Sequence, residues 1–132
     1  MKQNKELKRK AHGFKRFLNS VKYSVDGLKY AYTNEQSLTL HVVMTVAVVI
    51  GGSLLDITNT EWIICLFLIG LIMATELINT SLECLVDLVT SDFHPLAKAA
   101  KDTASAAVFM FSVVAGIIGC IIFIPYIVRL FM

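Results

Sequence analysis

The sequence predicts an all-α integral membrane protein with three transmembrane helices and an N-terminal amphipathic helix on the membrane surface. Of the 132 residues, 56% are hydrophobic and only 17% are charged. Long apolar blocks occur three times, which is rare in a soluble domain of this size. The basic residues gather at the start, since nine of the twelve Lys and Arg lie in residues 1–30. We expect one membrane domain over residues 1–132.

The surface helix is expected within the basic segment 1–34, which is amphipathic from about Gly13 onward. Polar side chains at Lys15, Lys22, Asp26 and Lys29 alternate there with apolar ones. The apolar residues recur at spacings of three and four: Phe14, Phe17, Leu18, Val21, Val25 and Leu28. Such a pattern is typical of a basic helix that lies in the plane of a membrane interface.

The first two transmembrane helices are expected at about 38–55 and 62–90. The connector between them, DITNTE (56–61), holds two acids and no base. The second helix opens with WIICLFLIGLIMAT (62–75), a run without any charge. At 1.5 Å per residue, this helix is long enough to cross a bilayer and to project beyond it.

The third transmembrane helix is expected at about 96–128. The segment TSDFHPLAKAAKD (90–102) begins as a loop, and Pro95 suits the first turn of a helix. Basic residues mark the cytoplasmic side of a membrane. We therefore expect the N-terminus and the Lys98/Lys101 segment in the cytoplasm, and the acidic connector outside.

Small residues on the third helix predict self-association. Ser112, Gly116 and Cys120 repeat every four residues, a spacing that lets helices pack closely in lipid. Three helices are also too few to enclose a site alone, so we expect a homo-oligomer. The alternative is that these residues merely accompany a lipid-facing helix.

A polar stripe interrupts the second half of the second helix, ELINTSLECLVD (76–87). At about 100° per residue, Glu76, Asn79, Glu83 and Asp87 fall within an arc of roughly 80° on one face. A carboxylate in hydrocarbon costs a few kcal/mol, so three in line indicate a function. The alternative is that this half of the helix has left the membrane, which explains Asp87 well but Glu76 poorly.

The residue types of the stripe suit a hard cation. Clustered carboxylates with an amide favour Mg²⁺, which often shares its ligands with substrate phosphates. A carboxylate free of metal near the bilayer boundary can accept a proton from a hydroxyl. The segment KAAKD adds Lys98, Lys101 and Asp102, whose lysines suit phosphate oxygens. Positive-inside anchoring is the alternative for these lysines.

The common nucleotide-binding signatures are absent, because the sequence holds neither G-x-x-x-x-G-K-[ST] nor G-x-G-x-x-G. The residues by themselves therefore predict a polytopic membrane protein with an acidic site at the cytoplasmic interface, acting on a lipid or moving an ion.

The segment ELINTSLECLVDLVTSDFHPLAKAAKDTASAAV (76–108) resembles the signature of the small prokaryotic diacylglycerol kinase family, which includes the undecaprenol kinases of Gram-positive bacteria. The shared pattern is E-x-x-N-x-x-x-E-x-x-x-D, a His, and A-K-D-x-x-S-A-A. Upstream, GFKRFLNSVKYSVDGLKYAYTNE (13–35) is similar to the surface helix of the family. The resemblance covers nearly the whole chain apart from a longer basic N-terminus.

The resemblance implies a homotrimer in the bacterial inner membrane that uses Mg·ATP to phosphorylate a lipid hydroxyl on the cytoplasmic side. It implies that Glu76 is the general base and that Asn79 helps to position the site. Glu35 and Glu83 would hold Mg²⁺ bridging the ATP phosphates, and Asp87 would have a supporting polar role. The remaining nucleotide contacts that it implies are Arg16, Tyr23, Asp92, Phe93, His94, Lys101 and Asp102.

The lipid acceptor is expected to be undecaprenol. The NTS sequence at 79–81, the AKAAKD run and the longer basic N-terminus resemble Gram-positive members, for which undecaprenol is the preferred alcohol. Diacylglycerol is the alternative acceptor. A non-enzymatic membrane protein, such as an ion-conducting or accessory subunit, is the alternative from another functional class. No nucleic-acid partner is expected.

Overall fold

The computed structural model describes residues 2–132, with side chains from Gly13 onward. This range contains four helices and no strand: α1 (Lys2–Asn34), α2 (Gln36–Leu55), α3 (Asn59–Val89) and α4 (Pro95–Leu130). Residues 1–34 and 35–132 form separate compact units, so each unit is described by itself. The predicted all-helical class, with three long apolar helices and an N-terminal helix, is confirmed. The basic side chains predicted for 1–12 lie outside the described part.

The N-terminal unit is one continuous helix. It extends back to Lys2, beyond the amphipathic pattern that begins at Gly13, because Lys, Glu, Leu, Arg and Ala in the earlier stretch are good helix formers. It ends at Asn34, whose Nδ2 donates to the carbonyl of Tyr30 at 2.7 Å. Thr33 donates likewise to the carbonyl of Lys29 at 2.9 Å. Both are side-chain bonds back to the carbonyl four residues earlier, which such residues commonly make near a helix end.

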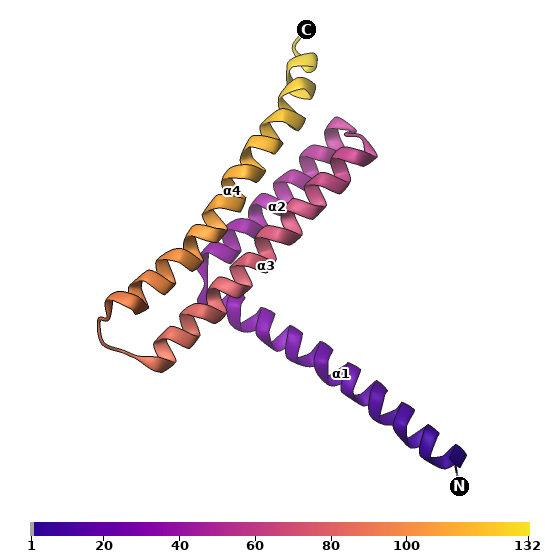
Figure 1. Ribbon diagram of the computed structural model, residues 1–132. Coiled ribbons are helices and arrows are strands. Elements are labelled where there is room, and N and C mark those ends of the chain that lie inside the picture. Colours follow the sequence, from indigo (N-terminus) through magenta and orange to yellow (C-terminus); the bar gives the residue numbers. More distant parts are fainter. Residues whose placement is uncertain (1) are drawn as a thin grey trace. The chain divides into compact units, whose positions relative to one another are not determined.

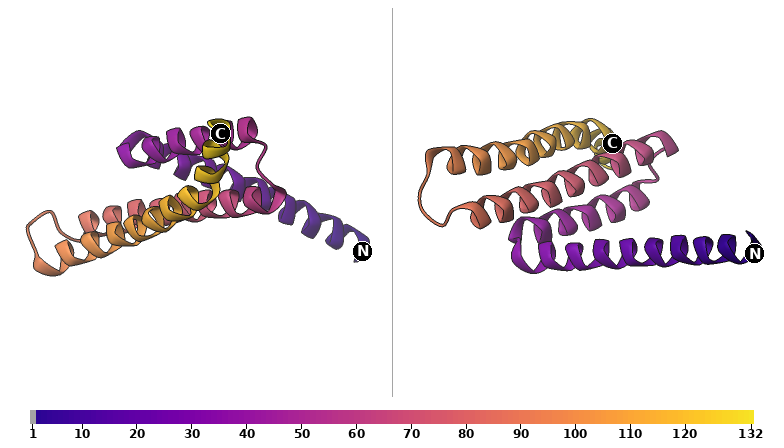
Figure 2. Two further views of the ribbon diagram at one scale, coloured as in Figure 1. Left: turned by 90° about the horizontal axis from the view of Figure 1, so that it is seen from above. Right: turned by 60° about the horizontal axis from the view of Figure 1, so that its bottom comes forward.

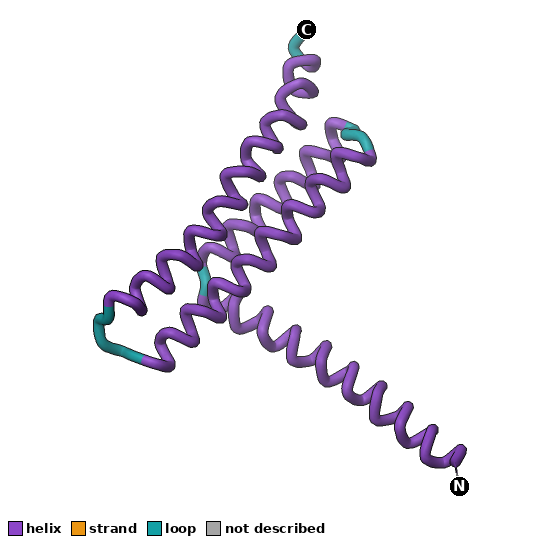
Figure 3. The backbone as a smooth tube through the Cα atoms, viewed as in Figure 1, coloured by secondary structure: helices purple, strands orange, loops and turns teal. Residues whose placement is uncertain are grey.

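The second unit consists of α2, α3 and α4, which run up, down and up along the chain (Figure 1). All three helices are long and apolar enough to cross a membrane. Short loops join them at 56–58 and 90–94, the teal segments in Figure 3. Among the described elements, α3 packs against both α2 and α4, and Figure 2 shows the same three helices from two further sides. Most of their large apolar side chains face outward, as a lipid environment requires.

The α2–α3 turn is tightly specified by backbone and side-chain hydrogen bonds. Asp56 adopts the left-handed conformation, with φ 51° and ψ 52°, and ends α2. The N–H of Ile57 then donates to the carbonyl of Gly52 at 3.2 Å. Thr58 caps α3 through a capping box with Glu61, in which each side chain accepts the other residue's backbone N–H. The box therefore starts α3 at Asn59, three residues before Trp62.

A hydrogen bond ties the end of α4 to this turn. The hydroxyl of Tyr126 donates to Glu61 Oε2 at 2.8 Å, the same oxygen that accepts from the Thr58 N–H at 2.8 Å. Ile57, Cys65 and Ile122 form the buried core beside it. At this end of the unit, α3 and α4 are therefore held together by both apolar packing and a hydrogen bond.

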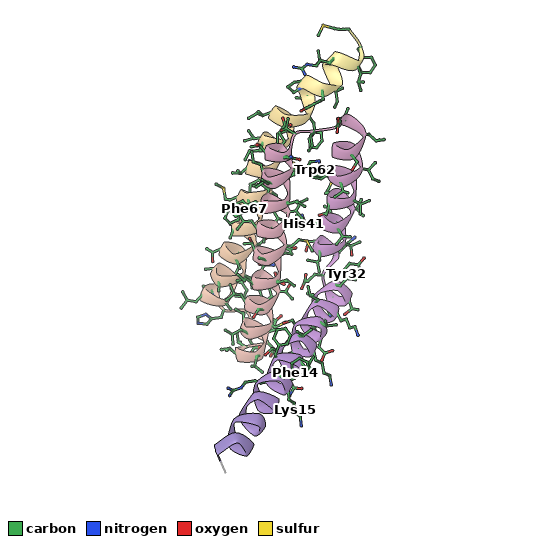
Figure 4. The ribbon with its side chains drawn as sticks, turned by 90° about the vertical axis from the view of Figure 1, so that its right-hand side faces the viewer. Phe14, Lys15, Tyr32, His41, Trp62 and Phe67 are labelled. Atoms are coloured by element: carbon green, nitrogen blue, oxygen red, sulfur yellow. The ribbon has the colours of Figure 1, made fainter. Side chains whose placement is uncertain are left out.

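Trp62 fills the space between α2 and α3, where Figure 4 labels it. A Cβ atom placed on Gly52 would lie 2.9 Å from the indole ring and 3.0 Å from Ile57 Cδ1. A Cβ on the neighbouring Gly51 would meet only Phe123, at an ordinary 3.7 Å. The close approach of the two helices therefore requires glycine at position 52 and not at position 51.

The two glycines allow a matched stability test. Gly52→Ala should lower the free energy of unfolding by about 1–3 kcal/mol, because the added methyl overpacks the indole. Gly51→Ala should leave stability unchanged or raise it by up to about 1 kcal/mol, since alanine favours the helix. Thermal unfolding of both variants in the same detergent measures the difference. Equal thermal midpoints for the two variants would contradict the packing argument.

Candidate active site

The polar stripe of α3 faces the protein interior at one end and solvent at the other. Glu76, Asn79 and Thr80 are buried, with exposed fractions of 2%, 7% and 4%. Glu83, two turns from Glu76, is partly buried, and Asp87 is exposed. The apolar side chains Ile78, Leu82, Leu85 and Leu88 of the same helix are exposed instead. This inversion is the pattern of a helix whose polar face lines a site while its apolar face meets lipid.

Hydrogen bonds within α3 hold the stripe in place. Asn79 Nδ2 donates to Glu83 Oε1 at 3.0 Å. The Thr80 hydroxyl donates to the backbone carbonyl of Glu76 at 3.1 Å, so its proton is directed into the helix. Asn79 Oδ1 is buried and has no hydrogen-bond partner within the described part of the chain. A buried oxygen without a donor is a natural place for a ligand or a cation.

Glu35 joins this group from another helix. It lies at the N-cap of α2 in an extended conformation, with φ −113° and ψ 114°, and its side chain caps nothing. Burial, then the negative charge of Glu83 and then that of Glu76, raises the pKa of the Glu35 carboxyl above its ordinary value. The structure therefore brings Glu35, Glu76 and Glu83 within electrostatic reach of one another. From the residues alone, Glu35 would have passed for a charge near a helix start.

The cluster of Glu35, Glu76 and Glu83 suits a cation whose coordination is completed by a bound ligand. Within residues 13–132, no three His, Cys, Asp or Glu side chains converge closely enough to hold a metal ion by themselves. Yet Glu35 and Glu83 repel each other, and the amide of Asn79, whose Oδ1 has no partner among the described residues, is bonded to Glu83. Mg²⁺ commonly takes one or two carboxylates and completes its coordination with substrate phosphates. The residues present fit that mode of binding.

The lysines predicted to bind phosphate are engaged in ion pairs. Lys101 Nζ lies 2.5 Å from Asp87 Oδ1 and so links α4 to α3. Lys98 pairs with Asp102 one turn along α4. The second pair could be read from its four-residue spacing, but no sequence signal indicated the first. The Lys98–Asp102 pair is exposed, and exposed pairs contribute only about 0–1 kcal/mol. In the other pair the Lys101 side chain is 36% exposed and that of Asp87 is 64% exposed.

The α3–α4 loop holds the predicted segment from Asp92 to His94. His94 caps α4 by accepting the Leu96 N–H at Nδ1, 3.2 Å away. The Asp92 N–H donates to the Thr90 hydroxyl at 3.2 Å, while Phe93 is 82% exposed. A pocket of about 380 Å³ opens here between the two helices. Its walls are mostly apolar: Val86, Val89, Thr90, His94, Leu96, Ala97 and Ala100.

Arg16 and Tyr23, the other two predicted nucleotide contacts, lie on α1. Both are exposed, and their seven-residue spacing puts them on one face of that helix. Because α1 belongs to the other compact unit, these two residues stay a prediction for the site.

The chain is similar to known proteins over most of its length. Residues 22–123 match the sequence profile described as prokaryotic diacylglycerol kinase. The chain belongs to the prokaryotic diacylglycerol kinase family. It is 42% identical over 110 residues to the undecaprenol kinase of Bacillus subtilis (strain 168), which covers 83% of this chain and 89% of that protein.

Diacylglycerol kinases of the family are similar over comparable lengths. The Helicobacter pylori enzyme (strain ATCC 700392 / 26695) is 41% identical over 102 residues, covering 77% of this chain and 80% of the relative. The Escherichia coli K12 enzyme is 33% identical over 110 residues, covering 83% and 90%. Family membership makes the chain a membrane-bound enzyme of the lipid kinase class and removes the non-enzymatic alternative.

The raised pKa of Glu35 predicts a pH-dependent stability in metal-free protein. The folded state holds a proton on Glu35 more tightly than the unfolded state, whose pKa lies near the ordinary 4.5. Its destabilising effect is therefore absent below pH 4.5 and grows as pH rises through the folded pKa. Glu35→Gln should raise the thermal midpoint in EDTA at pH 7 and leave it unchanged at pH 4. A midpoint lowered at pH 7 would contradict the repulsion among the three carboxylates.

Proposed function

We propose that this kinase transfers the γ-phosphate of ATP to the hydroxyl of undecaprenol at the cytoplasmic face of the membrane. The observation that supports the chemistry is the buried carboxylate of Glu76, which adjoins the apolar half of α3 and lies two turns from the half-exposed Glu83. A lipid alcohol can approach from the bilayer and a nucleotide from the water, so the two carboxylates suit separate roles.

In the proposed reaction, Glu76 accepts the proton of the lipid hydroxyl while the oxygen of that hydroxyl attacks the γ-phosphorus of ATP. A bond forms between that oxygen and phosphorus, the bond to the β-phosphate oxygen breaks, and ADP leaves. Asn79 holds Glu83 in place through its amide. Glu35 and Glu83 would hold Mg²⁺, which would supply positive charge against the negative charge of the phosphates. Phosphoryl transfer depends mainly on such positioning and neutralisation.

Nucleotide binding is proposed for the exposed end of the site. Lys101 would exchange Asp87 for a phosphate oxygen, and Asp102 would lie beside it on α4. The α3–α4 loop, from Asp92 through Phe93 to His94, borders the apolar pocket, whose lining suits a flat ring system. Arg16 and Tyr23 on α1 complete the proposed set of contacts.

The proposed acceptor has two supports. One is the 42% identity to an undecaprenol kinase. The other is that few buried side-chain donors lie near Glu76. Among the buried polar side chains of the described residues, Thr80 donates to a backbone carbonyl and Asn79 gives one of its two amide hydrogens to Glu83. The ester carbonyls of diacylglycerol would need donors, whereas an isoprenoid alcohol presents only its hydroxyl. Diacylglycerol, the substrate named for the other relatives, stays the second candidate.

We further propose a homotrimer in the bacterial inner membrane, with the N-terminus in the cytoplasm. A Cβ atom on Gly116 would touch nothing in the described part of the chain. Gly116 and Cys120 are exposed and Ser112 is partly exposed, so the stripe could receive another subunit. Lys98 and Lys101 lie at the same end of the unit as the start of α2, and the acids of 56–61 lie at the other end. This distribution supports the orientation by the positive-inside rule.

The acceptor can be tested by direct competition. The purified protein, reconstituted in lipid with Mg·ATP, should phosphorylate undecaprenol with a kcat/KM at least about tenfold above that for diacylglycerol, since a tenfold ratio corresponds to only about 1.4 kcal/mol. Radiolabelled γ-phosphate transfer to both alcohols at equal mole fraction gives the ratio. A ratio of one or below would make diacylglycerol the acceptor.

The base can be tested with a matched pair of amide substitutions. Glu76→Gln keeps the size of the side chain but removes the proton acceptor, so kcat should fall by about 10²–10⁴-fold. Asp56→Asn makes the same chemical change at the opposite end of the unit, in a left-handed turn that asparagine tolerates, and should leave kcat unchanged. Retention of normal turnover by Glu76→Gln, with an unchanged thermal midpoint, would exclude Glu76 as the base.

A further inference from the structure

We infer that α1 binds anionic lipid headgroups through a row of lysines spaced seven residues apart. The row consists of Lys8, Lys15, Lys22 and Lys29. The helix is continuous through all four positions, and Lys15, Lys22 and Lys29 are exposed. A seven-residue spacing drifts by only about 20° per repeat around a helix, so the four lysines form one narrow line.

Each lysine of the row directly follows an apolar residue. The first apolar series is Leu7, Phe14, Val21 and Leu28. A second series at the same period adds Ala11, Leu18, Val25 and Tyr32. The large apolar side chains described in these series are exposed, from 65% at Phe14 to 42% at Val25. The helix thus presents a continuous apolar face, bordered along one edge by the lysine row.

Pairing of this face with α1 of a second molecule is disfavoured. In a parallel pair, the lysine row would oppose the residues on the far edge of the apolar face, which contain no acid: Lys10, Phe17, Ser24 and Ala31. In an antiparallel pair the lysines would oppose one another, and like charges at these positions disfavour pairing. Gly13 and Gly27 also weaken a helix that would have to be stabilised by pairing alone.

An anionic bilayer surface matches both the apolar face and the lysine row. Apolar side chains of an interfacial helix enter the boundary between headgroups and acyl chains, and lysines just above that boundary are attracted to anionic phosphates. Asp26 is the one acidic side chain between Gly13 and Asn34, and it lies beside Lys22 and Lys29. Residues 1–34 hold nine basic and two acidic side chains, so the attraction prevails. Lys8 and Lys15 precede residue 22, where the family match begins.

The test compares two variants of the full chain that lose equal charge. One removes the row (Lys8→Gln, Lys15→Gln, Lys22→Gln, Lys29→Gln). The control removes four basic residues off the row (Lys2→Gln, Lys5→Gln, Arg9→Gln, Lys10→Gln). Each protein is placed in nanodiscs of phosphatidylcholine alone or with about one third phosphatidylglycerol, and amide hydrogen exchange is followed in residues 13–34.

Phosphatidylglycerol should slow exchange in the wild-type helix and in the control by about tenfold or more, since each lysine contributes separately to surface attraction. The row variant should show less than about a threefold change, and 0.5 M salt should abolish the wild-type effect by screening. Exchange in α3 and α4 reports that each variant is folded. Equal protection in both lipid mixtures, or equal loss in both variants, would overturn the proposal. The readout does not need turnover, so it is independent of the proposed acceptor.

Discussion

The structure depends on one constraint, which is that α3 must cross lipid while carrying carboxylates along one face. An unpaired charge in hydrocarbon is costly, so the chain turns that face inward and leaves the apolar side chains of α3 outside. The same rotation buries Glu76 and leaves Glu83 half exposed. A helix with its polar face turned inward therefore carries a group of buried polar side chains within an otherwise apolar span.

The two ends of the α2–α4 unit serve different purposes. The end with the Thr58–Glu61 capping box, the Tyr126 hydroxyl and the Trp62–Gly52 contact is tightly packed and internally satisfied. The opposite end holds mutually repelling carboxylates, an orphaned amide oxygen and exposed ion pairs. The packed end of the unit is thus separate from the end at which the carboxylates repel one another.

The N-terminal helix shows how one amphipathic pattern can combine two kinds of recognition. In the proposed arrangement, its apolar face would meet the hydrocarbon boundary and the lysine row would select for the charge of the headgroups. Arg16 and Tyr23, on another part of the same helix, are proposed to contact the nucleotide.

The sequence by itself determined the helical class, the three apolar spans and the single polar face of α3, because hydropathy and the 3.6-residue period act locally along the chain. It also showed the small-residue stripe of α4 and the lysine spacing of α1. Only the tertiary structure decided that Glu35 lies within electrostatic reach of Glu83, that Lys101 pairs with Asp87, and that Gly52 rather than Gly51 is required. Each of these depends on how far one helix slides and rotates against its neighbour, which is set by side-chain packing between distant segments and leaves no periodic trace in either helix.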